Sequence, residues 1–355
     1  MVVTVFGDVI GHRAILEMLE GDLHRPAHAY LFVGPGSVGK ATVARRFAAR
    51  VLCGDDAVGL RRALAGNHPD LVLVEPDGRT SLSVDRARET VSRSVLTPVE
   101  ATRKVFLFEE AGAMNEEAAN ALLKTLEEPT DTTIFLLVAE AEDDLPSTVA
   151  SRSRTVFFGR VPEAEIAEAL VALGIEAEQA DRVATSSGGR PGLALVLATR
   201  PEVAAFRRAW LSVPGRVTPR PGDAYRLAEE LVAAVDPLLE GLAERQGEEL
   251  IKGEGEGRDL RSVKERHERE RRRAATALHT GGLEILASWY RDAAVAQFGG
   301  PVRNRDVSGA DLAEVSARDA VAKATRVLDA IEALEANQRP ELAFGALFAD
   351  LGTAS

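Results

Sequence analysis

The sequence AYLFVGPGSVGK, residues 29–40, joins a short apolar run to a glycine-rich turn. A segment with helical spacing, residues 41–51, follows directly, so the turn lies between an expected strand and an expected helix. In such a turn the glycines let backbone N–H groups surround phosphate oxygens, while the helix N-terminus and a lysine add positive charge. We therefore predict a phosphate-binding loop made of Gly34, Pro35, Gly36, Ser37, Val38, Gly39 and Lys40. The alternative is a tight turn that binds no nucleotide.

Four more apolar runs follow this strand and alternate with amphipathic segments up to residue 158. The expected strands are Ala29–Val33, Leu71–Val74, Val105–Phe108, Ile134–Val138 and Thr155–Phe158. Because nearly every position in these runs is apolar, both faces of the sheet should be covered. The expected helices are Ala41–Val51, Val84–Leu96 and Asn115–Leu126, with Asp85 and Asn115 as candidate caps. The pattern predicts an α/β module with a parallel five-stranded sheet.

Strand patterns stop after Val161, and helical patterns continue to the end of the chain. Short helical segments are expected at Pro162–Ala172, Glu176–Ser186 and Leu193–Ala198, and longer ones from residue 202. We expect three domains: a nucleotide-binding-like αβ domain at 1–161, a small helical lid at 162–205 and an all-helical domain at 206–355. A linker at 214–221 and a connection at 248–257 should interrupt the last of these.

The composition narrows the class of protein. The 355 residues carry 43 Lys and Arg against 55 Asp and Glu, a net charge of −12, so any contact with DNA should be local. A single cysteine, Cys53, excludes an intrachain disulfide and a multi-cysteine zinc site. The N-terminus lacks a signal-peptide pattern, and no run of about 18 apolar residues occurs. We expect a soluble cytoplasmic protein with no membrane association.

The residues that would hold Mg²⁺ beside the loop are altered. The position after Lys40, where a Ser or Thr hydroxyl ordinarily ligates the metal, is Ala41, and Thr42 lies about 100° further around the helix. Two acids, Glu109 and Glu110, follow the third expected strand. Glu109 would then face the metal and Glu110 would orient the attacking water; the alternative is that both are solvated acids at a strand end. Glu109 is one methylene longer than the usual Asp. We expect ATP or ADP to bind weakly or without hydrolysis, with Mg²⁺ poorly held.

Beyond the loop, the chain carries a set of short motifs: Gly11-His12, His28–Phe32, His68-Pro69-Asp70, Asn120–Pro129 and Ser151-Arg152-Ser153. Together with the loop, this set resembles the clamp-loader AAA+ subunits of bacterial DNA polymerase III. The run NALLKTLEEP at 120–129 is the most specific part, and the resemblance extends from about residue 5 to residue 158. Weaker traces are Trp289–Asp292 and Asn304–Asp306. The resemblance implies an AAA+ module, a lid and a helical collar through which subunits assemble.

The family contains ATP-hydrolysing gamma/tau subunits and delta-prime subunits. The positions at which this chain departs from the family pattern indicate which of the two types it resembles. Besides Ala41, the lid position that resembles the family's sensing arginine is Gly192, with Arg190 two residues earlier. Ala139-Glu140 replaces the polar sensor after the fourth strand. The resemblance therefore favours the delta-prime type. Family members also carry a four-cysteine zinc module, of which Cys53 alone remains, so we expect no zinc and a buried, apolar-like Cys53.

Ser151-Arg152-Ser153 resembles the family motif whose arginine enters the ATP site of the neighbouring subunit. A guanidinium supplied in trans would stabilise the charge that spreads over the γ-phosphate during transfer. The resemblance thus assigns a trans role to Arg152. Two alternatives stay open: Arg152 as a surface arginine paired with Asp143 or Asp144, and Arg154 as the finger, since residues two apart on an extended chain share a face.

The resemblance implies partners rather than independent catalysis. A delta-prime-type subunit belongs to the DNA polymerase III holoenzyme and would assemble with gamma/tau and delta subunits to help open the sliding clamp at primer-template DNA. A nucleotide-free scaffold and an active gamma/tau-type or other autonomous AAA+ ATPase are the alternatives. The mixed-charge run at 258–273 is typical of a solvated helix more than of a DNA-binding one. Candidate DNA contacts are Arg88, Arg93 and Arg103.

Overall fold

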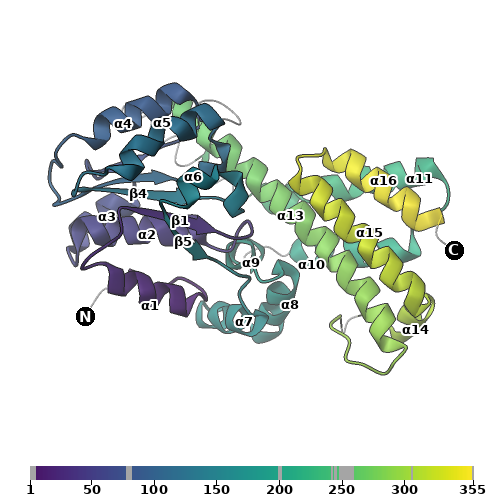
Figure 1. The fold of residues 1–355 in the computed structure, drawn as a ribbon. Coiled ribbons are helices and arrows are strands. Elements are labelled where there is room, and N and C mark those ends of the chain that lie inside the picture. The colour runs from purple at the N-terminus through teal and green to yellow at the C-terminus, as the bar shows by residue number, and fades with distance from the viewer. Residues whose placement is uncertain are drawn as a thin grey trace. The chain divides into compact units, whose positions relative to one another are not determined.

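The computed structural model describes residues 5–76, 82–198, 202–240, 243, 246–247, 260–304 and 307–353. The chain forms two compact units: Met1–Ala169 with Gly189–Gly192, and Leu170–Gly188 with Leu193–Ser355 (Figure 1). Both units contain part of the expected lid range, 162–205, and the threefold division at 161 and 205 stays a prediction.

The first unit contains a five-stranded sheet. Its strands are β1 (Ala29–Val33), β2 (Leu71–Leu73), β3 (Lys104–Phe108), β4 (Thr133–Val138) and β5 (Arg154–Phe157). The order is β2-β3-β4-β1-β5, and every neighbouring pair is parallel. The predicted parallel five-stranded sheet is confirmed, with strand ends within one residue of those expected. All carboxyl ends therefore meet at one edge, where ligands of such sheets bind.

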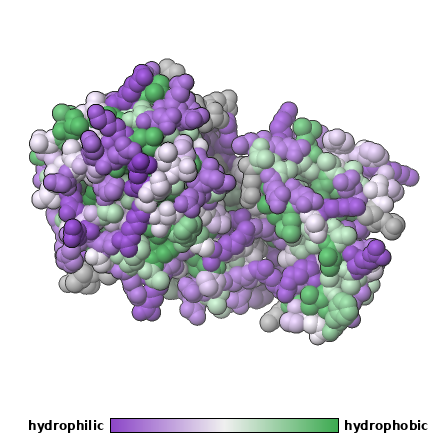
Figure 2. Space-filling model, in the orientation of Figure 1, coloured by the Kyte–Doolittle hydropathy of each residue, from purple (hydrophilic) through white to green (hydrophobic). Residues whose placement is uncertain are grey.

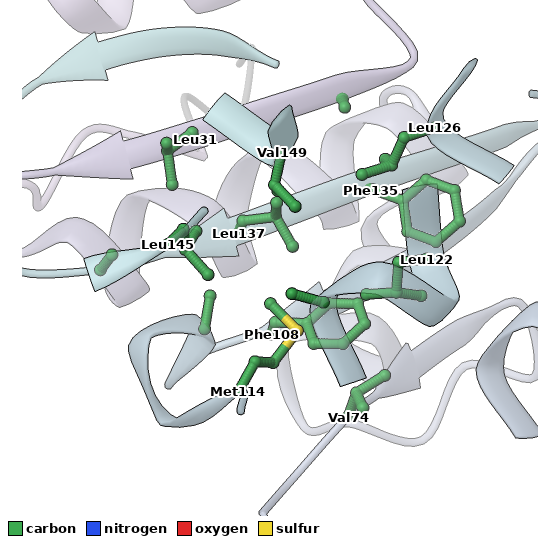
Figure 3. Packing of buried hydrophobic residues seen from close by; sticks show 14 of the residues in the cluster. Leu31, Val74, Phe108, Met114, Leu122, Leu126, Phe135, Leu137, Leu145 and Val149 are labelled. Carbon is green, nitrogen blue, oxygen red and sulfur yellow. The ribbon is translucent and has the colours of Figure 1, made fainter. Parts of the chain in front are cut away.

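Helices cover both faces of the sheet, as the apolar strands predicted (Figure 1). Alternate residues of a strand point to opposite faces. On one face Leu31, Phe135 and Leu137 pack with Leu122 and other side chains of α5 (Glu116–Glu127), as Figure 3 shows. On the other face the intervening strand residues pack against α1 (Arg13–Asp22) and α2 (Lys40–Cys53). The double burial fixes the register of β1 and hence the position of the loop that follows it.

Three further helices complete this unit. They are α3 (Ala57–Leu64), α4 (Val84–Ser94) and α6 (Ser147–Ala150), with short 3-10 turns η1 (Ala111–Ala113) and η2 (Glu142–Asp144). Asn115 caps α5 as predicted, since its side chain accepts from the N–H of Ala118. The cap of α4 is Ser83 rather than Asp85, which lies in the first turn instead. Asp85 was a wrong choice because the helix begins two residues earlier than a cap at that position requires.

The second unit is helical in the part that the structure describes. Its elements are α8 (Ala177–Ser187), α10 (Glu202–Leu211), η3 (Val213–Gly215), α11 (Pro221–Ala233), α13 (Leu260–Ala296), α14 (Gly309–Ala313), α15 (Ala317–Glu335) and α16 (Pro340–Thr353), while α7 (Glu163–Ala172) and α9 (Pro191–Ala198) are shared with the first unit. The expected linker at 214–221 holds η3 and the start of α11. The expected connection at 248–257 lies outside the described residues.

Asp292 and Asn304, from the two C-terminal family traces, form a buried polar network within the second unit, while residues 305–306 lie outside the described residues. One carboxylate oxygen of the buried Asp292 accepts from the N–H groups of Arg303 and Asn304, at 2.9 and 2.7 Å, and from Asn304 Nδ2 at 2.9 Å. Asn304 Oδ1 in turn accepts from Arg207 Nη2 at 2.7 Å. These residues hold the loop after α13 against α10 and α13, so they serve the fold of this unit.

Figure 2 shows polar side chains spread over the visible surface of both units. Within the described residues, no helix combines the length and the apolar character needed to span a membrane.

The His68-Pro69-Asp70 motif fastens two segments of the first unit. The buried Asp70 carboxylate accepts from the backbone N–H groups of residues 99–101 at 2.6, 2.8 and 2.8 Å. Burial by itself would raise the pKa of Asp70, but the three N–H donors and His68 outweigh it and hold the pKa below its ordinary value. The ionised carboxylate thereby ties the segment after α4 to the start of β2.

Replacing Asp70 by Asn should lower the free energy of unfolding by about 2–4 kcal/mol at neutral pH, because the amide loses the charge and presents a donor to other donors. A carboxyl group with a lowered pKa stabilises the fold above its unfolded value, 3.8, and this contribution is lost as the pH falls through the folded value. Urea denaturation during stepwise acidification should therefore bring wild type and Asp70→Asn together. A gap that persists in acid would contradict this, and Asp131→Asn, at an exposed position, is the control.

Candidate nucleotide-binding site

The predicted site residues gather at the carboxyl edge of the sheet. The loop Gly34–Lys40 follows β1, Glu109 and Glu110 follow β3, and Glu140 follows β4. The N–H of Gly34 donates to the carbonyl of Glu140 at 3.0 Å, so the ends of β1 and β4 are joined directly. The structure thus brings together the loop, the acids after β3 and the altered sensor position.

The loop adopts a backbone that needs its glycines. Gly34 and Gly39 have φ angles of 147° and 104°, which L side chains rarely adopt. A Cβ on Gly34 would lie 2.1 Å from the carbonyl oxygen of Phe158. Ser37 takes a left-handed conformation with φ of 61°. The turn leads directly into α2, whose N-terminus is the part of a helix suited to anions.

Lys40 folds back over the loop. Its ammonium group donates to the carbonyl of Gly34 and, at 2.6 Å, to that of Pro35. Burial lowers the pKa of Lys40 to about 8, partly offset by Glu140 and Asp144, which raise it. To bind a phosphate oxygen, the ammonium group has to leave these two carbonyls. The loop therefore satisfies its own lysine in the conformation described here.

Two other loop carbonyls are held by residues of the same unit. The carbonyl of Ser37 accepts from the N–H of Gly192 at 3.1 Å. The carbonyl of Val38 accepts from His12 Nε2 at 2.9 Å, so that nitrogen carries the proton. Gly192, the position where the family resemblance expects an arginine, contributes a backbone contact instead, and its missing side chain permits the approach. Arg190 is buried.

An acid occupies the sensor position, as the sequence indicated. Glu140 is exposed, and one of its carboxylate oxygens lies 3.2 Å from where a Cβ on Gly36 would be. The carboxylate of Asp144 accepts from the N–H groups of Glu140 and Ala141 at 2.9 and 2.8 Å and so fixes this turn. The negative charges near the loop oppose the binding of a polyphosphate.

The structure adds a residue that sequence reasoning missed, Arg45. Its Nε donates to one oxygen of Glu109 and its Nη2 to the other, at 2.7 Å. Arg45 lies four residues after Ala41, on the same face of α2, and this spacing was the signal available in the sequence. Thr42 is exposed, and Glu110 directly precedes η1.

The donor set does not fit the Mg²⁺ that phosphate loops of this kind ordinarily use. Mg²⁺ requires oxygen ligands in near-octahedral geometry. Ala41 has no side-chain oxygen to offer, and both oxygens of Glu109 accept hydrogen bonds from a guanidinium group. Metal-assisted phosphoryl transfer is therefore not supported by these residues.

Arg152 and Arg154 differ clearly in their surroundings. Arg152 is partly exposed at the end of α6, where its Nη2 lies 2.5 Å from Glu127 Oε1 and its Nη1 donates to the carbonyl of Thr148 at 2.9 Å. The alternative in which Arg152 is a paired surface arginine would therefore involve Glu127, at the end of α5, rather than Asp143 or Asp144. Arg154 pairs with Asp22 at 2.5 Å, which also accepts from the hydroxyl of Tyr30 at 2.9 Å. Arg154 thus ties β5 and β1 to α1.

Two remaining predictions need correction. Cys53 is half-buried rather than buried, because it lies at the end of α2 between two apolar clusters, and burial raises the pKa of its thiol. In the run 258–273, Glu268 and Arg272 form the expected ion pair at 3.9 Å, but Arg269 is buried rather than solvated. Arg258 lies outside the described residues.

Arg88 and Arg93 are exposed and pair with acids of their own helix, Asp85 and Glu89.

Comparison with known proteins agrees with this architecture. Residues 11–162 match the protein family described as DNA polymerase III, delta subunit. Over this region the chain is therefore similar to a family of DNA polymerase III subunits. The predicted α/β module with a parallel five-stranded sheet, followed by helices, is confirmed.

The chain has relatives of two kinds. It is 41% identical over 135 residues to subunit delta' of Pseudomonas aeruginosa, covering 36% of this chain and 41% of that protein. It is 34% identical over 156 residues to subunit delta' of Bacillus subtilis, covering 41% and 46%. It is also 33% identical over 175 residues to subunit tau/gamma of Haemophilus influenzae, covering 46% and 25%. The chain thus matches less than half the length of each relative.

Among solved structures, a DNA polymerase III gamma-subunit-related protein of Thermotoga maritima aligns over 95% of this chain and 98% of its own. The sequence identity is 16% and the TM-score 0.44, which is too distant a likeness to assign a function.

Replacing Glu140 by Gln should tighten the binding of ADP about three- to tenfold, because it removes a negative charge next to Gly36 without changing the side chain's size. Titration of a fluorescent ADP analogue at low salt measures the effect, which should shrink as salt screens the charge. Glu117→Gln, at an exposed position in the first turn of α5, is the control. Unchanged affinity in Glu140→Gln would show that this carboxylate does not face the ligand.

Proposed function

We propose that this chain is a delta-prime-type subunit of the bacterial replicative clamp loader. In this role it assembles with gamma/tau and delta subunits and helps to load the sliding clamp onto primed DNA, which it meets through the assembled complex. The family match over 11–162 and the 41% identity to a delta' subunit support the clamp-loader role. The chain works within the DNA polymerase III holoenzyme and has little or no catalytic activity of its own.

The proposed absence of hydrolysis rests on which residues occupy the positions that would face the metal. Ala41 stands where a metal-ligating hydroxyl is needed, and Arg45 engages Glu109. Hydrolysis requires Mg²⁺ held in register with the γ-phosphate and an oriented water. With these positions altered, the loop can hold phosphates through its N–H groups and Lys40 but cannot promote their transfer. ATP or ADP is therefore a bound, unhydrolysed ligand of low affinity.

Arg152 is the residue through which this subunit acts on a neighbour's ATP. Its side chain is about one-third exposed and is held by surface contacts to Glu127 and Thr148. A partner's γ-phosphate can compete for such a guanidinium, since exposed ion pairs contribute only about 0–1 kcal/mol. Arg154 is less suited to this role because its pairing with Asp22 joins elements of the fold.

An active gamma/tau-type motor or another autonomous AAA+ ATPase is the second candidate. The observation in its favour is the intact loop with Lys40, together with 33% identity to a tau/gamma subunit. The two candidates differ in what the purified chain does alone.

The isolated chain should hydrolyse ATP no faster than its Lys40→Ala variant, with or without primed DNA, because Mg²⁺ is not held in register. A phosphate-release assay on both proteins measures this. DNA-stimulated turnover that Lys40→Ala abolishes would favour the motor instead.

Arg152→Ala should leave assembly with partner subunits intact and slow ATP hydrolysis at the site it completes by at least about a thousandfold, the lower end for arginine fingers supplied in trans. Size-exclusion chromatography and steady-state ATPase of the reconstituted complex test both parts. Arg13→Ala removes a more exposed arginine, which pairs with Glu17 within α1, and is the matched control. If assembly fails, or turnover stays at the level of the control, Arg152 is a structural residue.

A further inference from the structure

The face of α2 next to Glu109 carries a small residue followed by a long cation. Ala41 and Arg45 are four residues apart and so lie one above the other on the helix. Side chains of a helix lean toward its N-terminus, so the Arg45 side chain extends back over the turn that contains Ala41. The methyl group of Ala41 leaves room there that a hydroxyl-bearing, metal-ligating residue would not.

The guanidinium group of Arg45 meets Glu109 with two parallel hydrogen bonds. Such fork-to-fork pairing is the strongest arrangement open to a carboxylate and an arginine. The side chains are 37% and 21% exposed, so the pair is screened by water only in part. A guanidinium stays protonated at any pH the protein experiences, so its charge is permanent. Glu109 is thus neutralised by the chain itself.

We propose that Arg45 takes the place of the divalent cation beside Glu109, so that ATP or ADP held by the loop binds as the metal-free anion. This inference rests on the proposed nucleotide binding for its ligand, but not for the exclusion of the metal. A nucleotide that arrives with Mg²⁺ would bring two positive charges toward Arg45 and would find Glu109 already engaged. The chemical form recognised is therefore a nucleoside di- or triphosphate free of metal.

The first test compares the affinity for a fluorescent ADP analogue in Mg²⁺ with that in EDTA. Wild type should bind equally tightly in both, within about twofold, whereas Arg45→Gln should bind at least about tenfold more tightly with Mg²⁺, equal to about 1.4 kcal/mol. Arg46→Gln is the matched control, because this adjacent arginine of α2 pairs with Asp8 at 2.5 Å instead. Wild-type affinity that falls tenfold on chelation overturns the proposal, and so does Arg45→Gln that remains indifferent to Mg²⁺.

The second test uses Mn²⁺ alone and needs no nucleotide. Electron paramagnetic resonance of free Mn²⁺ should show equal binding by wild type and Glu109→Gln. Arg45→Gln should bind Mn²⁺ at least about fivefold more tightly than Arg45→Gln/Glu109→Gln, because the freed carboxylate then becomes a ligand. Binding by wild type that depends on Glu109, or no gain in Arg45→Gln, overturns the exclusion of metal by Arg45. If wild type binds no nucleotide at all, the proposed ligand fails and this second test alone decides the inference.

Discussion

Burial of both faces of a short parallel sheet is the constraint on which the first unit depends. Leu31 and Phe32 are neighbours on β1, yet they belong to the apolar clusters of opposite faces. A shift of β1 by one residue would exchange them, so the register with β4 and β5 is strongly specified. Because the register is fixed, the turn that follows β1 is fixed as well. Packing of the core thereby sets the positions of the loop residues at the edge of the sheet.

The features that could be predicted from the sequence are those that depend on residues close together in the chain. The strand at Ala29–Val33 and the loop after it were readable because an apolar run, a glycine-rich turn and a helical repeat follow one another without interruption. The pairing of Arg45 with Glu109 was not readable, because 64 residues separate them and either side chain alone is typical of a solvated surface. The contact between Arg152 and Glu127 was not readable for the same reason: the alternative considered for Arg152 named acids nearby in the chain, whereas the fold brings Glu127 to it.

Several of the short motifs hold backbone segments in place through hydrogen bonds from their side chains. His12 holds the carbonyl of Val38, and Asp70 holds three consecutive N–H groups after α4. Asp292 does the same for the loop after α13. In each case a side chain satisfies backbone groups that no helix or strand partner serves. These contacts support the fold and take no part in phosphate chemistry, so the motifs that supply them do not distinguish a motor from a silent subunit.

The charged side chains at the loop are paired within the chain, and this pairing decides whether the site needs a ligand to balance them. Lys40 is satisfied by carbonyls of the loop, and Glu109 by Arg45. A ligand that binds only the folded state raises stability with its concentration, and a site that needs the ligand to balance its charges depends on that supply. Here the balance is internal. The folded state therefore needs neither nucleotide nor Mg²⁺ to balance the charges of Lys40 and Glu109.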